Sequence, residues 1–308
     1  MQIAVIFPSV MYREGAAGVG RVIQGIEAIG FDELDMFDHV VMGYPTESRR
    51  TPFYTPQMPI MEAFMLLSYA AALTHRVRLG TGVLVLPQRQ PTLVAKQVAT
   101  LDTLSGGRVR LGVGIGWQAS EYEALDEDFA SRGARMDEAI HLMRAYWRDE
   151  HVNFDGKYYR ADEIAMEPKP PQGGDIPIWI GGTKDAALRR TATLGDGWMA
   201  MNAPGDDPLE VRLAKLKQYA EEAGRDPATI KLQMSLSPGP LDKDLRKKFY
   251  ADPGLLLDRV GQLKALGFTH TAIDCVPIFQ LGYRSSEALL EQLEKIYERL
   301  RPELAEGE

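Results

Sequence analysis

Cysteine is almost absent from the sequence. Cys275 is the only one among 308 residues, so neither an internal disulfide nor a metal site built from several thiolates can form. The histidines do not compensate, because their spacing does not match a zinc site; they are His39, His75, His141, His151 and His270. These absences predict a protein of a reducing compartment, the cytoplasm, without a bound metal.

Long hydrophobic runs and clusters of basic residues are missing as well. No apolar stretch approaches the roughly 20 residues that a membrane helix requires, and the opening MQIAVIFPSV lacks the basic start of a signal peptide. Acidic residues outnumber basic ones, 43 to 35, which gives a net charge of −8. Nucleic-acid binding draws on clustered Lys and Arg. We therefore expect a soluble protein whose partner is a small molecule and neither nucleic acid nor a membrane.

What the sequence does contain is an alternation of two kinds of segment. Short apolar, β-branched segments predict eight strands, at 3–7, 33–37, 77–83, 108–114, 176–180, 197–201, 230–236 and 270–274. Segments of helical period predict eight helices between them, at 20–30, 61–75, 91–105, 134–149, 184–195, 208–224, 254–267 and 286–300. This alternation predicts an α/β fold, the closed (β/α)8 TIM barrel. An open doubly wound sheet remains the alternative, although the first strand lacks the glycine turn that such a sheet places under a nucleotide.

Three stretches are longer than a barrel needs. The first, near 41–59, follows the second strand and is rich in proline, as lids often are. The second, 151–174, contains VNFDGKYYR, in which Asp-Gly marks the turn of a hairpin. The third, 237–254, follows the seventh strand. We expect residues 1–308 to form one barrel domain with these insertions.

The fourth predicted strand raises the question of a nucleotide-binding glycine loop. It ends in LGVGIGW, where Gly112, Gly114 and Gly116 recur at every second residue. The dinucleotide fingerprint has a different spacing and a helix directly after it, whereas a period of two places all three glycines on one face of a strand. A face without side chains allows another backbone or a flat ligand to approach closely.

The chemistry of a (β/α)8 barrel gathers at the C-terminal ends of its strands. Here those ends are mostly apolar or glycine-rich; they carry Phe7-Pro8, Asp38-His39, Gly82-Val83, Gly116-Trp117, Gly181-Gly182-Thr183, Met199 to Asn202, Ser235 and Asp274. Such a set suits a pocket for a flat heterocycle better than hydrolysis by two opposed carboxylates.

Some of these residues could serve a bound heterocycle, and each also has a plain structural explanation. His39 could exchange a proton near neutral pH, with Asp38 fixing its orientation, or the pair could simply open a loop. The N–H groups that follow Gly181 could attract an anion such as phosphate, or they could form an ordinary strand-to-helix turn. Trp117 and Trp198 could wall a ring system or fill the barrel rim.

Four segments resemble the luciferase-like monooxygenase superfamily, and within it the branch of coenzyme F420-dependent oxidoreductases. They are FDELDMFDH, VRLGTGVLVLPQRQPTLVAKQVATLDTLSGGRVRLGVGIGW, EPKPPQGGDIPIWIGG and LGDGW, and they follow one another between Gly30 and Trp198. The resemblance implies a bacterial luciferase-like TIM barrel with insertions, often a homodimer, that binds a flavin or the related deazaflavin F420 at the barrel mouth.

The resemblance also implies roles for individual residues. A non-prolyl cis peptide that supports the ring system falls at Gly82-Val83. Asp38 and His39 fall where deazaflavin-dependent relatives have an Asp-His pair, the histidine beside the reactive carbon of the cofactor. The remaining implied cofactor contacts are Gly116, Trp117 and Trp198 near the ring and Gly181, Gly182 and Thr183 at the phosphate.

Two positions depart from the sugar-phosphate dehydrogenases of this branch. Trp117 stands where those enzymes carry an acidic residue after the fourth strand, and MNAP, at 201–204, stands where they use Thr and Lys to bind phosphate. These departures argue against that substrate class.

Three hypotheses about function follow. In the first, F420 carries out hydride transfer to or from a small apolar substrate while His39 supplies or removes the proton. In the second, FMN takes the place of F420, and the protein is a monooxygenase that receives reduced flavin from a separate reductase. In the third, the barrel only binds or stores a flavin.

Overall fold

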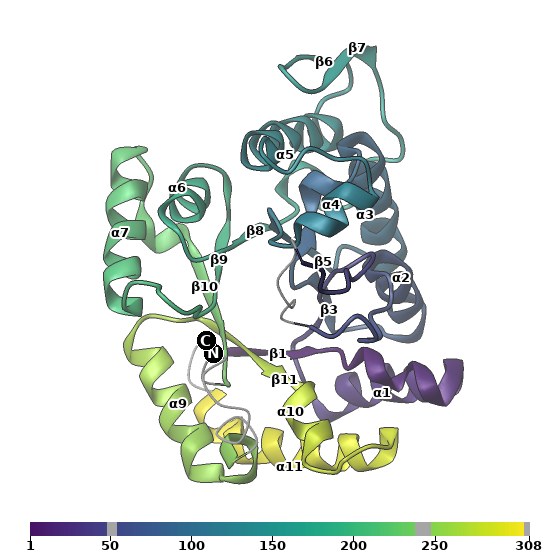
Figure 1. Cartoon of the computed structure of the whole chain (residues 1–308), viewed down its shortest axis with the longest axis vertical. Helices are drawn as coiled ribbons and strands as arrows, with labels where there is room; N and C mark the ends of the chain where they lie inside the picture. The colour runs from purple at the N-terminus through teal and green to yellow at the C-terminus, as the bar shows by residue number, and fades with distance from the viewer. Residues whose placement is uncertain (48–53, 238–247, 305–308) are drawn as a thin grey trace.

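The computed structural model describes residues 1–47, 54–237 and 248–304, and eight parallel strands in it close into a barrel (Figure 1). In chain order they are β1 (Gln2–Ile6), β2 (Glu33–Met36), β3 (Arg78–Thr81), β5 (Val109–Gly114), β8 (Ile178–Gly181), β9 (Gly197–Ala200), β10 (Lys231–Ser235) and β11 (His270–Asp274). Each strand pairs in parallel with the next, and β11 pairs with β1 to close the ring. The two-residue strand β4 (Leu84–Val85) also pairs with β5. The predicted (β/α)8 barrel is confirmed, with every strand at a predicted segment.

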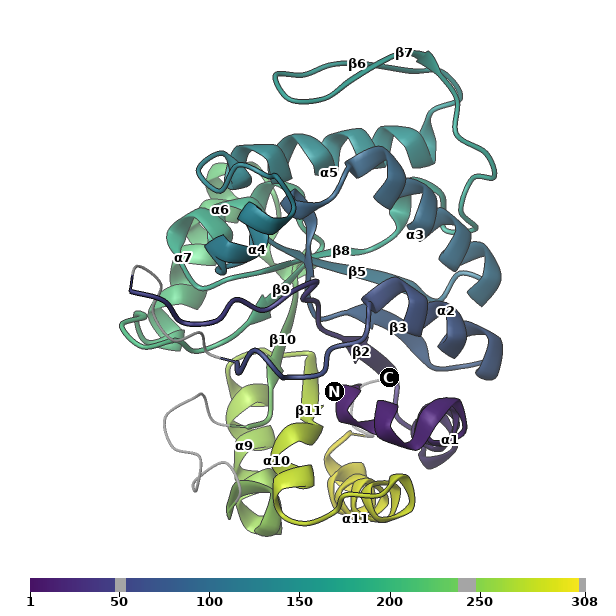
Figure 2. The same ribbon diagram turned by 45° about the vertical axis from the view of Figure 1, so that its right-hand side comes forward.

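The helices around the barrel also lie where the helical period predicts them (Figure 2). They are α1 (Gly15–Ile29), α2 (Ala63–Leu73), α3 (Pro91–Ser105), α5 (Arg132–Arg148), α6 (Asp185–Leu194), α7 (Leu209–Glu222), α9 (Pro253–Ala265) and α11 (Ser286–Leu304). Gly30 follows α1 with a left-handed backbone, φ 117°, as glycine commonly does at the end of a helix. Two short helices, α4 (Ala119–Ala124) and α10 (Cys275–Gln280), have no counterpart among the predicted segments.

The insertions differ in how much of them the structure describes. The second contains the predicted hairpin, β6 (Val152–Asp155) and β7 (Arg160–Ile164), which projects beyond α5 at the top of Figure 2. Residues 48–53 of the first insertion and 238–247 of the third lie outside the described residues.

The face without side chains on β5 is filled by the chain itself. A Cβ atom on Gly112 would lie 2.0 Å from the carbonyl oxygen of Thr81, and one on Gly114 would lie 2.8 Å from a methyl group of Val83. A Cβ atom on Gly116 would similarly meet Val85, at 2.6 Å. The sequence left two explanations for these glycines, the close approach of another backbone or of a flat ligand. The structure supports the first, because β3 and β4 pack against this face of β5.

A charged network fills the barrel interior below these glycines. Arg110 on β5 donates to Glu33, at 2.5 Å, and to Asp35, both on β2, and Gln233 on β10 donates to Asp35 at 3.1 Å. All four side chains are buried. Burial raises the pKa of Asp35 to about 6, against the opposing effect of the Arg110 guanidinium. Arg110 and the two carboxylates pair with one another, whereas Oε1 of Gln233 is buried without a partner among the described residues. The network supports the barrel mouth from beneath.

Candidate active site

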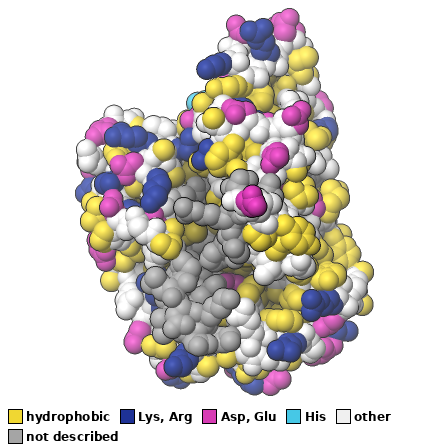
Figure 3. Space-filling model, viewed as in Figure 1, with side chains coloured by type: hydrophobic (Ala, Val, Ile, Leu, Met, Phe, Trp, Pro, Cys, Tyr) yellow, Lys and Arg dark blue, Asp and Glu magenta, His cyan; other side chains and the backbone are white. Residues whose placement is uncertain are grey.

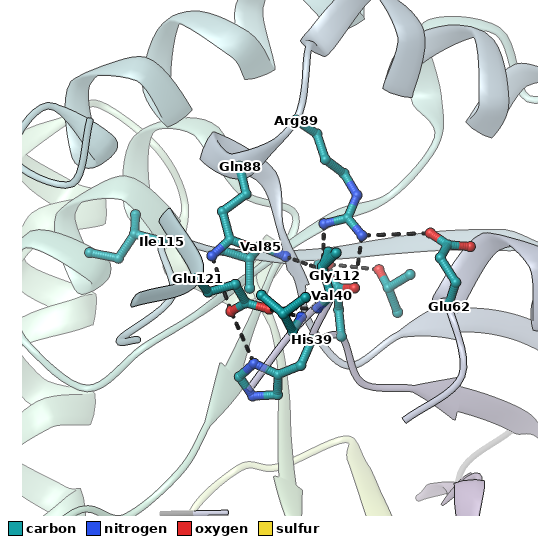
Figure 4. Close-up of polar contacts among 12 residues, drawn as sticks. His39, Val40, Glu62, Val85, Gln88, Arg89, Gly112, Ile115 and Glu121 are labelled. Carbon is teal, nitrogen blue, oxygen red and sulfur yellow. Dashed lines mark hydrogen bonds and ion pairs between the residues drawn. The ribbon is translucent and has the colours of Figure 1, made fainter. Parts of the chain in front are cut away.

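His39 lies in the loop after β2, at the C-terminal face of the barrel, and its imidazole is held by Glu121. The Nδ1 atom of His39 lies 3.1 Å from Oε2 of Glu121 (Figure 4). The two side chains are only 7% and 1% exposed, so water competes little for this contact. Glu121 comes from α4, the short helix that follows β5. The structure therefore joins two strand ends through one buried imidazole–carboxylate pair.

The Glu121 carboxylate accepts several further hydrogen bonds. Oε1 accepts from the backbone N–H of Val40 at 2.5 Å and of Val41 at 3.3 Å, and Oε2 accepts from Nε2 of Gln88 at 3.1 Å. Burial raises the pKa of Glu121, but the bonds from His39 and Gln88 outweigh that effect and hold it below its usual value. Glu121 is thus a carboxylate at neutral pH, and a carboxylate can only accept. The hydrogen on the His39 side of the pair belongs to Nδ1.

Asp38 does not orient His39, and that part of the sequence interpretation is wrong. Its two oxygens accept from the guanidinium of Arg89, at 2.6 and 2.9 Å, and Oδ2 also accepts from the N–H of Val85 at 3.0 Å. These bonds turn the Asp38 carboxylate away from the neighbouring imidazole. Asp38 instead ties the loop after β2 to β4 and to the turn that carries Arg89.

Aromatic rings surround the imidazole of His39. The ring centroids of Tyr54 and Trp117 each lie 5.6 Å from that of His39, both in edge-on geometry. Trp117 directly follows the glycine strand and is 47% exposed. Its indole is therefore available to a flat ligand, as the sequence predicts for a wall of the pocket.

The end of β3 has the backbone that the resemblance implies. The Gly82-Val83 peptide bond is cis. The Val83 side chain lies over Gly114 and also over Gly181, where a Cβ atom would approach it to 2.9 Å. The third, fourth and fifth barrel strands thus meet at Val83, which is bordered by glycine on both sides.

The Gly181-Gly182-Thr183 turn leads into α6, and its polar groups are tied to an aspartate. Asp206, buried in the loop after β9, accepts from Oγ1 of Thr183 and from Nζ of Lys184, each at 2.8 Å. No side chain caps α6, so its first N–H groups have no side-chain acceptor. The turn therefore retains backbone donors for an anion, although Asp206 already pairs with its lysine.

Trp198 does not wall the barrel mouth. Its side chain is fully buried and lies on the outer side of β9, where the guanidinium of Arg212 on α7 is 5.6 Å from the ring. Met199, the next residue, points into the barrel toward Gly112. Trp198 instead donates from Nε1 to the carbonyl of Gly182 at 2.8 Å, so it supports the turn from behind.

Glu121, Arg89, Tyr54 and Asp206 are the site residues that the sequence interpretation missed. Glu121 left no usable signal, because it lies on α4, a helix of six residues that is too short to show a helical period. The other three leave no local signal, since loops and neighbouring elements bring them to the site.

The described part of the chain offers no group of three His, Cys, Asp or Glu side chains that could hold a metal ion. None of its helices combines the length and apolar character that crossing a bilayer demands.

Known proteins resemble this chain over most of its length. A family model described as luciferase-like monooxygenase matches residues 2–246. An uncharacterized protein of Mycobacterium bovis is 40% identical over 208 residues, which cover 65% of this chain and 70% of that protein. An F420-dependent glucose-6-phosphate dehydrogenase of Segniliparus rotundus is 29% identical over 267 residues, which cover 84% of this chain and 76% of the dehydrogenase.

A solved structure has the same overall fold. The crystal structure of a monooxygenase from Streptomyces bottropensis matches with a TM-score of 0.76 at 22% identity, covering 99% of this chain and 100% of the other. At this identity the likeness shows a shared fold and nothing more specific.

Proposed function

The chain belongs to the luciferase-like monooxygenase family, and from that membership we propose that it is an oxidoreductase that uses coenzyme F420 to transfer hydride to or from a small, apolar organic substrate. The F420-dependent relative from Segniliparus rotundus supports the choice of cofactor. The apolar, glycine-rich strand ends support a flat heterocycle at the barrel mouth.

The observation that carries the proposal is the pair formed by His39 and Glu121. Because the carboxylate accepts from Nδ1, the other ring nitrogen, Nε2, is the one that can take up or release a proton. Among the described residues no hydrogen bond to Nε2 exists. An oriented imidazole with one unoccupied nitrogen is what general acid–base catalysis requires.

The residues around the barrel mouth fit such a cofactor. Bound F420 would supply the hydride-transfer chemistry. We propose that its ring is held by Gly82, Val83, Gly116 and Trp117 and its phosphate by the N–H groups around Gly181, Gly182 and Thr183, with Trp198 as a support for that turn. The fit rests on the exposed indole and on the uncapped start of α6. Asp38 acts through Arg89 and Val85, as a residue that positions the loop.

FMN is the alternative cofactor. The matching family is described as luciferase-like monooxygenase, and the same barrel mouth would accommodate a flavin. The protein would then depend on a separate reductase as its partner. In either case we propose a cytoplasmic protein, in keeping with the single, buried thiol of Cys275.

We further propose a homodimer. Exposed apolar side chains gather on α2 and α3, on the right-hand flank in Figure 3; they are Met65, Tyr69, Leu93 and Leu104. Exposed apolar side chains grouped on neighbouring helices are typical of an interface between protein chains.

The test is an anaerobic single-turnover assay with reduced F420 and a panel of apolar carbonyl and unsaturated compounds. We expect oxidation of the cofactor without oxygen, slowed about 100-fold or more by His39→Asn and unaffected by a matched control, His75→Asn, whose residue is exposed. Turnover that requires oxygen and reduced FMN would favour the monooxygenase. An unchanged rate in His39→Asn would exclude the role of His39.

A further inference from the structure

A cavity lies beside the loop after β9, on the flank where α7 and α9 run (Figure 1). Its volume is about 560 Å³, which lies within the range of sites for small molecules. The loop after β9 and the start of α7 form one wall, and the second half of α9 forms the other. Much of the lining is apolar; these residues are Ala203, Pro204, Pro208, Leu209, Ala265 and Leu266.

Arg259 on α9 lines this cavity, and within residues 1–237 and 248–304, as far as the structure describes them, no carboxylate pairs with it. Its terminal nitrogens have only weak contacts, to Oε1 of Gln262 at 3.5 Å and to the sulfur of Met234 at 3.4 Å. Its Nε atom is buried without any partner in the structure. Burial lowers the pKa of Arg259, and no carboxylate offsets the effect. Partial burial of an unpaired guanidinium carries a desolvation penalty that destabilises the folded protein unless an anion pairs with the charge.

The acidic residues of the opposite wall do not supply that anion. Asp206 pairs with Lys184 and Thr183, and Asp207 pairs with Lys215 at 2.8 Å. Glu210 is exposed, and its charge opposes a ligand of high negative charge. The cavity therefore offers one cation, an apolar surface and a negative rim.

We propose that this cavity binds a small organic monocarboxylate with an apolar body, the carboxylate on Arg259 and the body against Leu209 and Leu266. Guanidinium and carboxylate match in geometry and charge. The negative rim selects against dianions such as phosphate esters. Asp206 lines the cavity and also contacts the turn before α6, through Thr183 and Lys184. The three residues that we assign to the ligand, Arg259, Leu209 and Leu266, have no role in the proposed reaction, so the inference does not depend on it.

Phenylacetate is a suitable probe, with phenylacetamide as its uncharged counterpart. Binding is followed by NMR of methyl-labelled protein, in which Leu209 and Leu266 report the cavity and Val83 reports the barrel mouth. We expect phenylacetate to shift the two leucine methyls and to bind about tenfold or more tightly than the amide. Equal affinity for the two, or shifts at Val83 alone, would overturn the proposal while leaving the proposed reaction untouched.

Variants separate the guanidinium from the remainder of the cavity. Arg259→Gln should remove the preference for phenylacetate over the amide, and Arg259→Lys should keep part of it. Arg299→Gln, at an exposed position of α11, is the control and should bind as the wild type does. A preference that persists in Arg259→Gln contradicts the assignment. Should that variant not fold, the comparison of acid and amide in the wild type still decides.

Discussion

The carboxylate of Glu121 accepts from a side chain of the β2 loop, from the backbone of that loop and from Gln88. It therefore fixes both the position of the loop and the tautomer of the imidazole. Asp38, next to His39 in the chain, instead bonds Arg89 and Val85. Adjacent residues in an extended loop direct their side chains apart, which is why the sequence alone paired the wrong carboxylate with His39.

Glu121→Gln is predicted to slow hydride transfer about tenfold or more, with little change in cofactor affinity, because the amide has one acceptor oxygen in place of two and carries no negative charge. Because the pKa of Glu121 is lowered in the folded protein, its contribution to stability is complete above the unfolded value and is lost as pH falls through the folded value. The variant should therefore show a flatter decline in the free energy of unfolding below about pH 4.5.

The control for this prediction is Glu298→Gln, at an exposed position of α11. Rates and unfolding free energies are compared for the three proteins from pH 7 to pH 3. Equal decline with pH in wild type and Glu121→Gln, together with equal rates, would show that the carboxylate has no positioning role.

His270, at the start of β11, should make stability depend on pH. Burial beside Trp179 lowers its pKa to about 4, so the unfolded chain binds a proton that the folded protein does not between about pH 6.5 and 4. Stability is complete above the unfolded pKa and falls as pH falls toward the folded one, by up to about 3 kcal/mol. The free energy of unfolding, measured with denaturant, should therefore fall less for His270→Asn than for the wild type between pH 7 and pH 4. The exposed His151→Asn is the control, and equal losses in all three proteins would contradict the assignment.

At the scale of elements, the strands and long helices were predictable because each has a strong period or a continuous apolar run. The 91–105 helix, for instance, coincides with α3. The helix α4 was not predictable, because six residues contain fewer than two turns of the pattern. Since that short helix carries Glu121, the sequence analysis missed the residue because it missed the helix. The position of Trp198 was misread because it depends on which face of β9 points outward.

The close approach of β3 and β5 gives a prediction of its own. Gly112→Ala should destabilise the protein by at least about 2 kcal/mol, because the new methyl group would lie 2.0 Å from the backbone oxygen of Thr81. Gly261→Ala in α9 is the matched control. It has nothing within 4 Å of the added Cβ atom, and it should stabilise the protein by about 0.5–1 kcal/mol. Equal unfolding midpoints for the two variants would refute this explanation of the glycine strand.

At the scale of the whole molecule, the apolar flank of α2 and α3 should hold two copies together. Met65→Glu combined with Leu93→Glu would place charges at two side chains that are 63% and 58% exposed, so the monomer should keep its fold and lose its partner. Sedimentation velocity is expected to show a dimer for the wild type and a monomer for the double variant. Leu255→Glu on α9, which is 38% exposed, should remain dimeric. A monomeric wild type would refute the proposed homodimer.

The complete barrel positions one mouth, where the ends of β2, β3, β5 and β8 bring His39, Val83, Trp117 and the turn before α6 to a common face. The fold could be predicted from the sequence. The choice between F420 and FMN could not, because both cofactors present a flat tricyclic ring and a phosphate to the same kind of backbone.

The most direct test of the central claim is an anaerobic titration of the purified protein with F420 and, separately, with FMN, followed by tryptophan fluorescence. Trp117 is the exposed reporter at the mouth, whereas Trp198 is buried, so Trp117→Phe identifies the origin of the signal. We predict saturable quenching by F420 at about tenfold lower concentration than by FMN, and its loss in Trp117→Phe. Tighter binding of FMN, or binding of neither compound, would contradict the account.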